Sequence, residues 1–190
     1  MTFWSETQLS PKRNFRWQLR IMGHASGEET VWWAKTVNTP SFDVSEVAHD
    51  YFDNKFYYPG RVSWADLEVT LVDPVTPDAA KLTLDIINKT GYNVSTKAGA
   101  KKTISKQKSS SEGLKSVIID LLDADGKELE TWTLKNAWIK AVKFGDLDYS
   151  NDELRQISIT FKYDWAECTI HPGPNSNPKT DYFAPVDPTV

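Results

Sequence analysis

The chain has 190 residues, which is enough for one domain with a substantial hydrophobic core. Apolar residues make up 39% of it and aromatic residues 12%, a composition typical of globular and not of disordered proteins. The net charge of −4 argues against nucleic-acid binding over the whole surface, because phosphate binding needs an excess of Lys and Arg on the face involved.

The cysteine content and the hydropathy indicate the cellular compartment. Cys168 is the single cysteine, so an internal disulfide is excluded and a reducing compartment is the simpler inference. No apolar run approaches the roughly 20 residues that span a bilayer, and the first residues lack a signal-peptide pattern. We therefore expect a protein that is made in a cytoplasm and has no membrane partner.

The N-terminal part predicts an irregular arm followed by strands. Residues 1–13 are polar and aromatic and form the expected arm. A first strand is predicted from Asn14, because apolar residues alternate with polar ones there. The apolar face of this strand contains Phe15, Trp17, Leu19 and Ile21. A second strand is predicted over 31–37, where adjacent tryptophans, Trp32 and Trp33, indicate that both faces are covered.

Residues 41–73 predict a long β-hairpin that leads into a further strand. The hairpin, 41–60, has a polar tip at 53–55, and Pro59-Gly60 is expected to break its return arm. Its arms are long enough to project beyond a small domain. They carry apolar side chains that a solvated loop does not need, which indicates a protein partner. These side chains are Phe42, Val44, Val47, Phe52, Phe56, Tyr57 and Tyr58.

The strand after the hairpin has one apolar face. Leu67, Val69 and Leu71 point one way, while Asp66, Glu68 and Thr70 point the other way.

One helix is predicted over about 76–90. Thr76 is a favourable N-cap, Pro77 suits the first helical position, and Gly91 is the expected end. The apolar stripe of this helix contains Ala79, Leu82, Thr83, Ile86 and Ile87. A single helix among strands must lie on a sheet.

The Lys-rich stretch 92–113 shows no periodicity and predicts a flexible basic loop. Contact with phosphates is one interpretation of its lysines. A solvated loop is favoured, because no aromatic residues alternate with the lysines.

The remaining chain predicts two more strand regions and a tail. Stretches 114–122 and 128–134 form a hairpin around Asp123–Gly126, and 135–149 is a connection. A last strand is predicted over 154–167, with one face formed by Ile157, Ile159, Phe161, Tyr163 and Trp165. The Pro-rich tail, 169–190, is expected to be extended and to dock, if at all, on another molecule. The sum is a mainly β domain, 14–168, a barrel or sandwich of mixed antiparallel sheets with one packed helix.

The sequence offers no convincing catalytic, metal or cofactor site. The histidines His24, His49 and His171 have no metal ligand at suitable spacing, and Cys168 has no activating neighbour. Asp123–Gly126 is similar to the start of a calcium loop, but its flanking strands favour a hairpin turn. The acidic cluster at 146–152 could supply paired carboxylates, although a solvated turn is the better interpretation. We therefore expect no enzyme, no metal and no cofactor.

The eight tryptophans leave a carbohydrate-binding function open, because exposed indoles stack on sugars. Strand positions favour core roles for four of them, namely Trp17, Trp64, Trp132 and Trp165.

Four motifs carry a resemblance to a known family. They are F-Y-Y-P-G-R at 56–61, S-W-x-x-L-x-V-T-L-V-D-P at 63–74, G-D-L-D-Y-S-N-D-E-L at 145–154 and I-x-I-T-F-K-Y-D-W-A-E at 157–167. In this order, around a single helix, they resemble the tail tube proteins of contractile-tailed bacteriophages. The resemblance covers about 15–167.

The resemblance implies a ring-forming structural protein of a phage virion. In this family hexameric rings join their sheets into a β-barrel and stack into a tube inside a contractile sheath. Genomic DNA passes through the lumen without tight binding. The implied partners are further copies of the chain, the sheath protein, the baseplate and the tail terminator.

The implied roles fall on two stretches. Residues 42–58 would contact the neighbouring ring, and Asp66 and Glu68 are candidates for lining the lumen. Alternatives are the tube subunit of a related contractile injection system, a baseplate tube initiator, or a monomeric carbohydrate-binding β-sandwich.

Overall fold

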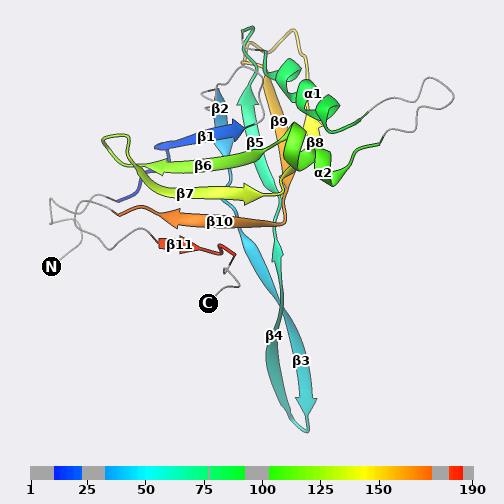
Figure 1. The fold of residues 1–190 in the computed structure, drawn as a ribbon, viewed down its shortest axis with the longest axis vertical. Coiled ribbons are helices and arrows are strands. Elements are labelled where there is room, and N and C mark those ends of the chain that lie inside the picture. The colour runs from blue at the N-terminus through cyan, green and yellow to red at the C-terminus, as the bar shows by residue number, and fades with distance from the viewer. Residues whose placement is uncertain (1–10, 23–32, 77, 93–102, 173–179, 186–190) are drawn as a thin grey trace.

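A computed structural model describes residues 11–22, 33–76, 78–92, 103–172 and 180–185. In this part of the chain three antiparallel sheets are present (Figure 1). Sheet A has five strands, in the order β1 (Trp17–Met22), β6 (Ser116–Leu122), β7 (Glu128–Lys135), β10 (Trp165–Ile170) and β11 (Thr180–Tyr182). Sheet B has four strands, in the order β2 (Ala34–Val37), β5 (Leu67–Val72), β9 (Gln156–Lys162) and β8 (Trp138–Lys143). Sheet C is a separate ribbon of β3 (Phe42–Tyr51) and β4 (Asn54–Trp64).

The hydrophobic core is one cluster to which sheets A and B both contribute. Strand β5 supplies Leu67, Val69 and Leu71 through its alternating pattern. Its paired neighbour β9 supplies the adjacent row of apolar side chains, which ends in Phe161. Burial of such side chains stabilises the fold by about 1.5–3 kcal/mol each. The expectation of a mainly β fold with one main helix is confirmed.

Helix α1 (Ala79–Lys89) begins two residues later than its predicted cap implies. Asp78, and not Thr76, is the N-cap, and its carboxylate accepts a hydrogen bond from the Lys81 amide at 2.8 Å. A carboxylate at this position also complements the positive end of the helix dipole. The predicted end is correct, because Gly91 follows with a φ of +97°. Pro77 lies outside the described residues.

The stretch expected to be a flexible Lys-rich loop is partly helical. Residues 93–102 lie outside the described part, but helical turns α2 (Lys106–Lys108) and η2 (Ser109–Gly113) follow. Packing at the end of α1 holds these helical turns in place. Ser109 is buried, and a side chain at Gly113 would clash with Thr90. Lys106 forms an ion pair with Asp164 at 2.6 Å.

The predicted last strand is in fact two strands in different sheets. Strand β9 ends at Lys162, and β10 begins at Trp165 beside β7. The buried positions shift at this break, since Tyr163 is followed by Ala166 on the core side. Trp165 therefore does not share the face of Phe161. The alternation of apolar residues continues through the break and hides it.

Three more expectations are wrong in detail. The connection at 135–149 contains strand β8, which pairs with β9. Strand β1 begins at Trp17, and Phe15 is 74% exposed. The tail docks on its own domain, because β11 pairs with β10. Among the tryptophans expected in the core, Trp17, Trp64 and Trp132 are half-buried and pack against it, and Trp165 is half-buried as well.

Candidate assembly surfaces

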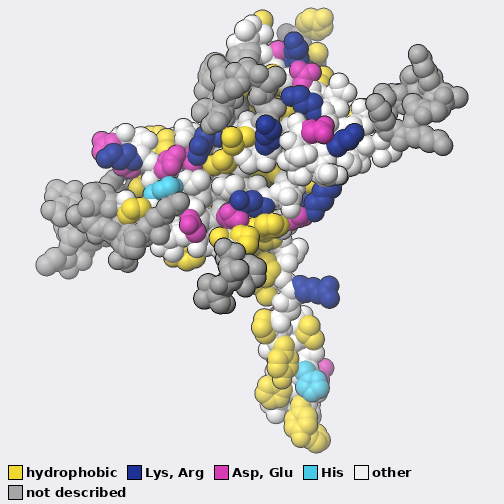
Figure 2. Space-filling model, viewed as in Figure 1, with side chains coloured by type: hydrophobic (Ala, Val, Ile, Leu, Met, Phe, Trp, Pro, Cys, Tyr) yellow, Lys and Arg dark blue, Asp and Glu magenta, His cyan; other side chains and the backbone are white. Residues whose placement is uncertain are grey.

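The hairpin β3–β4 projects from one end of the molecule as a twisted ribbon (Figure 1). Every residue of β3 is exposed, and every residue of β4 except Trp64 is exposed too. The register places Val47 opposite Tyr58 on one face and Ala48 opposite Tyr57 on the other face. Apolar side chains therefore lie on both faces of the ribbon. Figure 2 shows hydrophobic atoms along the face in view. Beyond the root, the described part of the body covers neither face.

All seven hairpin residues of the sequence prediction lie on this ribbon, with exposed fractions between 41% and 88%. The tip differs from the expected polar turn at 53–55. It is formed by Phe52, which is 88% exposed with a φ of +50°, and the ring of Tyr51 packs edge-on against it at 4.7 Å. The tip is therefore an aromatic knob.

Pro59-Gly60 does not break the return arm. Strand β4 continues through these residues, and a bulge there shifts the pairing with β3. The hydroxyl of Ser45 accepts a hydrogen bond from the Arg61 amide at 2.8 Å. A Cβ on Gly60 would lie 2.3 Å from that hydroxyl, so glycine allows the close approach. A bulge bends and twists a ribbon, so Gly60 contributes to the direction in which the hairpin projects.

An aromatic cluster fixes the root of the hairpin to the body. Trp64 packs against Phe42 at 5.2 Å, Tyr163 at 5.9 Å and Phe183 at 5.6 Å between ring centroids. Burial raises the pKa of Tyr163 to about 12. The sequence analysis missed Phe183, because a lone aromatic residue in a Pro-rich tail carries no periodic signal.

The two candidates for the lumen lie on the outer face of sheet B, but only Glu68 has no ion pair with another described side chain. The carboxylate of Asp66 lies 2.6 Å from Lys140 and 2.8 Å from Lys162. Hydrogen bonds from Lys140 and then Lys162 hold the pKa of Asp66 below its usual value. Glu68 is exposed on β5, where its neighbours on this face include the small hydroxyl side chains Thr70 and Thr160.

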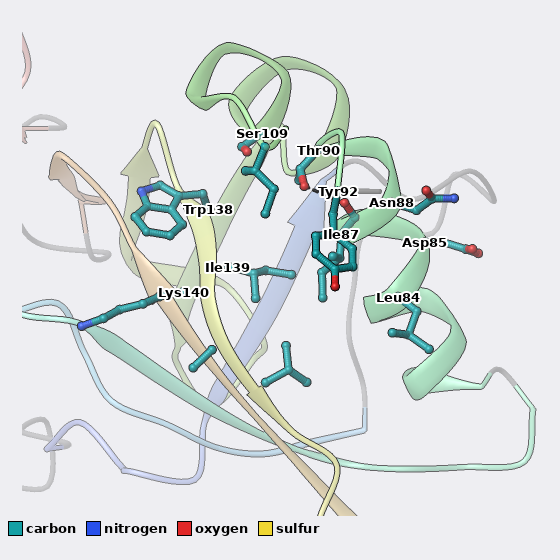
Figure 3. A pocket seen from close by; sticks show the side chains of 13 residues that line it. Leu84, Asp85, Ile87, Asn88, Thr90, Tyr92, Ser109, Trp138, Ile139 and Lys140 are labelled. Carbon is teal, nitrogen blue, oxygen red and sulfur yellow. Dashed lines mark hydrogen bonds between the residues drawn. The ribbon is translucent and has the colours of Figure 1, made fainter. Parts of the chain in front are cut away.

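A groove separates helix α1 from strand β8, which is an edge of sheet B among the described strands (Figure 3). Leu84 and Ile87 line it from the helix side, and Trp138 and Ile139 line it from the strand side. Its lining is mainly apolar, and Leu84 is 51% exposed. An apolar groove beside an unpaired strand edge is suited to accept another strand.

The acidic cluster of the sequence analysis lies on the exposed connection between β8 and β9 and does not form a carboxylate pair. Asp148 accepts hydrogen bonds from the backbone and the hydroxyl of Ser150, which lowers its pKa. Arg155 closes the loop by donating to the carbonyl of Phe144 at 3.2 Å. The described residues contain no group of His, Cys, Asp and Glu that could hold a metal ion.

Two further findings limit the chemistry. Cys168 is buried, and burial raises the pKa of its thiol to about 11, so the thiol is protonated and inert at neutral pH. Among the described helices, none is long and apolar enough to cross a membrane.

The comparisons with known proteins fit this geometry. The family model of the T4-like virus tail tube protein gp19 matches residues 84–167. A sheath/tube terminator of the extracellular contractile injection system PVC superposes over 84% of this chain and 97% of its own, with a TM-score of 0.62 and 18% identity. The chain has the tail tube fold.

Two other solved structures of the tail tube fold are similar. One belongs to the PVC sheath–tube complex, with a TM-score of 0.61 and 18% identity over 87% of this chain and 99% of that one. The other belongs to the baseplate of the anti-feeding prophage, which was 6-fold symmetrised, with a TM-score of 0.55 and 13% identity over 84% and 96% of the two chains. A comparison with curated proteins finds no match.

These findings bear on the functional expectations. The matching family model is that of a tail tube protein, and the similar solved structures come from sheath–tube, terminator and baseplate assemblies. The fold of this chain is that of tube and terminator proteins of contractile systems. The residues that would carry assembly, on the hairpin and on sheet B, stay predictions.

Proposed function

We propose that this protein is the tube subunit of a contractile phage tail. Hexameric rings of it stack into a tube inside a sheath, and the tube conducts genomic DNA into the host. The observation that carries the proposal is the hairpin β3–β4, which exposes apolar side chains on both faces of a tail tube fold. An isolated two-stranded ribbon is at best marginally stable in water, so this one needs a partner.

Ring closure is supported by sheet B, whose edge strands β2 and β8 have no further strand beside them in the described part of the chain. Unpaired edges are a liability in a monomer, and pairing β2 of one copy with β8 of the next removes them all in a closed ring. Such a contact is heterologous, and it gives a ring when its rotation closes. The apolar groove beside β8 would receive the incoming strand. The 6-fold symmetry of the similar baseplate structure supports six copies.

The lumen would be lined by the outer face of sheet B. The exposed carboxylate of Glu68 would repel DNA phosphates there, whereas Asp66 is paired with two lysines. Glu68 is therefore the stronger candidate. Hydroxyl side chains beside Glu68 add no positive charge.

The proposal is tested with the purified full chain at increasing concentration. Light scattering after size exclusion measures the mass, and negative-stain electron microscopy shows the particles. We expect rings with sixfold symmetry and stacked tubes at higher concentration. A stable monomer at every concentration would overturn the proposal, and quenching of tryptophan fluorescence by sugars would favour a carbohydrate-binding function.

Glu68→Lys is expected to slow DNA passage, since it replaces a repelling side chain with a phosphate-binding one in each subunit. The measurement is DNA release from intact particles carrying the variant, followed by a fluorescent dye. Thr160→Lys is not a neutral control, because Thr160 lies opposite Glu68 on the same face. Lys81→Glu, at an exposed position of α1, is the control. Unchanged DNA release with Glu68→Lys would remove Glu68 from the residues that line the lumen.

A tube terminator is the second candidate, favoured by the similarity to the PVC sheath/tube terminator. A terminator would cap tube ends and would not form long tubes alone. Adding the protein to tubes whose ends are labelled separates the two: growth indicates a tube subunit, and arrest indicates a terminator. In a related injection system the same tube would pass no DNA. In each case sheath and baseplate proteins are the expected partners.

A further inference from the structure

The hairpin β3–β4 is held to the body at one end only. It forms a sheet of its own, so no strand of sheet A or sheet B pairs with it in the described part of the chain. The aromatic contacts that join it to the body lie at its first residue pair, where Phe42 of β3 is opposite Trp64 of β4. A ribbon held at one end can pivot there, so the contacts at this pair decide the direction in which it projects.

The end of strand β9 holds one strand of the hairpin. The ring of Tyr163 lies 5.9 Å from the ring of Trp64 between centroids. Lys162 donates a hydrogen bond to the carbonyl of Trp64 at 3.1 Å. Both contacts are made with β4 and neither with β3. They anchor the hairpin at Trp64, but they do not oppose its rotation about that residue.

The C-terminal segment contacts both strands of the hairpin. The ring of Phe183 lies 5.6 Å from the ring of Phe42 and 5.6 Å from the ring of Trp64, in edge-on geometry with each. Aromatic rings in this geometry attract each other. Phe183 and Pro185 also line one pocket with Val62 of β4. The segment therefore meets β3 and β4 at the same residue pair, close to where the hairpin leaves the body (Figure 1).

The segment is itself fixed to sheet A. Strand β11 pairs with β10, and the hydroxyl of Thr169 donates a hydrogen bond to the carboxylate of Asp181 at 2.6 Å. Phe183 follows with a φ of +61°, a left-handed conformation that a bulky residue adopts only at a cost in free energy. The chain turns at this residue, and its ring reaches the hairpin root. The ring contacts there offset the cost of the turn.

The segment contributes little to the body. Every residue of β11 is exposed, and Phe183 is 50% exposed and lies outside the core cluster. The match to the tail tube family model ends at residue 167, before this segment. Contacts that add little to the core and yet meet both strands of the hairpin favour an orienting role.

We propose that the segment 180–185 is a strap that holds the hairpin in its direction, with Phe183 as the positioning residue. Preorganisation of a binding element lowers the cost of ordering it on association. The consequence for stacking rests on the proposed tube function, since the six hairpins of the proposed ring must meet the next ring together. A hairpin that has the right direction about a tenth of the time binds about tenfold more weakly at each contact.

A distance measurement between two spin labels tests the orienting role. The labels are attached at Asp53→Cys in the hairpin tip and at Asp125→Cys in the turn between β6 and β7, which are both exposed positions. The native Cys168 is buried and takes up little label. The protein is kept below the concentration at which tubes form, and labelled chains are mixed with an excess of unlabelled chains. The measurement then reports distances within one chain.

Phe183→Ala is expected to broaden the distribution of distances between the two labels and to leave the melting temperature unchanged. Phe183→Tyr keeps the ring and should keep the narrow distribution. Tyr182→Ala is the matched control, because Tyr182 is exposed to a similar extent on the same segment and its ring is not among those that contact the hairpin root. An unchanged distribution for Phe183→Ala, or an equal broadening for Tyr182→Ala, would overturn the inference.

Stacking gives a second measure. The protein concentration at which tubes form should rise about tenfold or more for Phe183→Ala and should stay unchanged for Tyr182→Ala. A chain that ends at residue 179 should behave as Phe183→Ala does. A broader distribution with an unchanged threshold for tube formation would overturn the inference and leave the tube function standing. An absence of tubes from the unmodified chain would overturn the tube function instead, and the distance distributions would still decide whether the strap orients the hairpin.

Discussion

Replacing residues 47–56 by a tight turn is expected to abolish tube formation while rings still form. The stretch forms its own sheet, and in the described chain the body packs on the hairpin only at its root. Its removal therefore takes nothing from the core. In the assembly the apolar side chains of the ribbon would be buried against a neighbouring ring, and each fully buried one contributes about 1.5–3 kcal/mol. In the proposed hexameric ring six such hairpins would act together, so the loss is large.

Negative-stain microscopy compares the particles that the trimmed and the unmodified protein form. Melting curves compare the stability of the two proteins. A point variant refines it, because Phe52→Ser removes the knob at the tip, and Phe15→Ser removes a similarly exposed phenylalanine elsewhere. We expect Phe52→Ser to shorten tubes and Phe15→Ser to leave them unchanged. Normal tubes from the trimmed protein would refute a stacking role for the hairpin.

The hairpin was predictable from the sequence because its signals are local. Two arms and aromatic side chains that the domain core does not need indicate a projecting ribbon. Its tip and its bulge were not predictable. Phe52 occupies a left-handed turn position that propensity assigns to the polar residues after it, and Gly60 has the appearance of a strand end until the neighbouring Ser45 is seen.

The split of the last predicted strand shows the limit of periodicity. Apolar residues alternate from Ile157 to Trp165, yet the chain changes sheets after Lys162. Which sheet a strand joins depends on pairing partners far away in sequence, such as β7 for β10. Periodicity reports only which face is apolar.

The docking of β11 and Phe183 was also beyond sequence analysis. Pro-rich composition predicts an extended tail, and it is extended over Thr180–Tyr182, after which Phe183 has a φ of +61°. Its place beside β10 follows from an unpaired strand edge and from an aromatic cluster that only the fold assembles.

Asp120 is a buried carboxylate that the sequence analysis overlooked, and its loss is expected to have the largest effect on stability. Its side chain is 0% exposed, on the outer face of sheet A. Arg20 donates two hydrogen bonds to it, at 2.7 and 2.9 Å, while Gln18 donates at 3.0 Å and Thr131 at 2.9 Å. The network joins β1, β6 and β7. A lone aspartate in the apolar run of β6, opposite Arg and Gln, was the available signal.

Asp120→Ala should lower the free energy of unfolding by about 3–5 kcal/mol, because it leaves the guanidinium of Arg20 without its buried partner. For a chain of this length that corresponds to a fall in melting temperature of about 6–20 °C. The matched control is Asp125→Ala in the exposed turn between β6 and β7, which should change stability by less than about 0.5 kcal/mol.

Urea unfolding followed by tryptophan fluorescence measures both variants. The paired variant Asp120→Leu, Arg20→Met removes both charges and should recover much of the lost stability, since the penalty of the single variant is a partly buried guanidinium whose remaining ion-pair partner, Glu128, lies 3.6 Å away. Equal instability of the paired and single variants would instead mean that the hydrogen bonds from Gln18 and Thr131 hold β1 and β7 to β6.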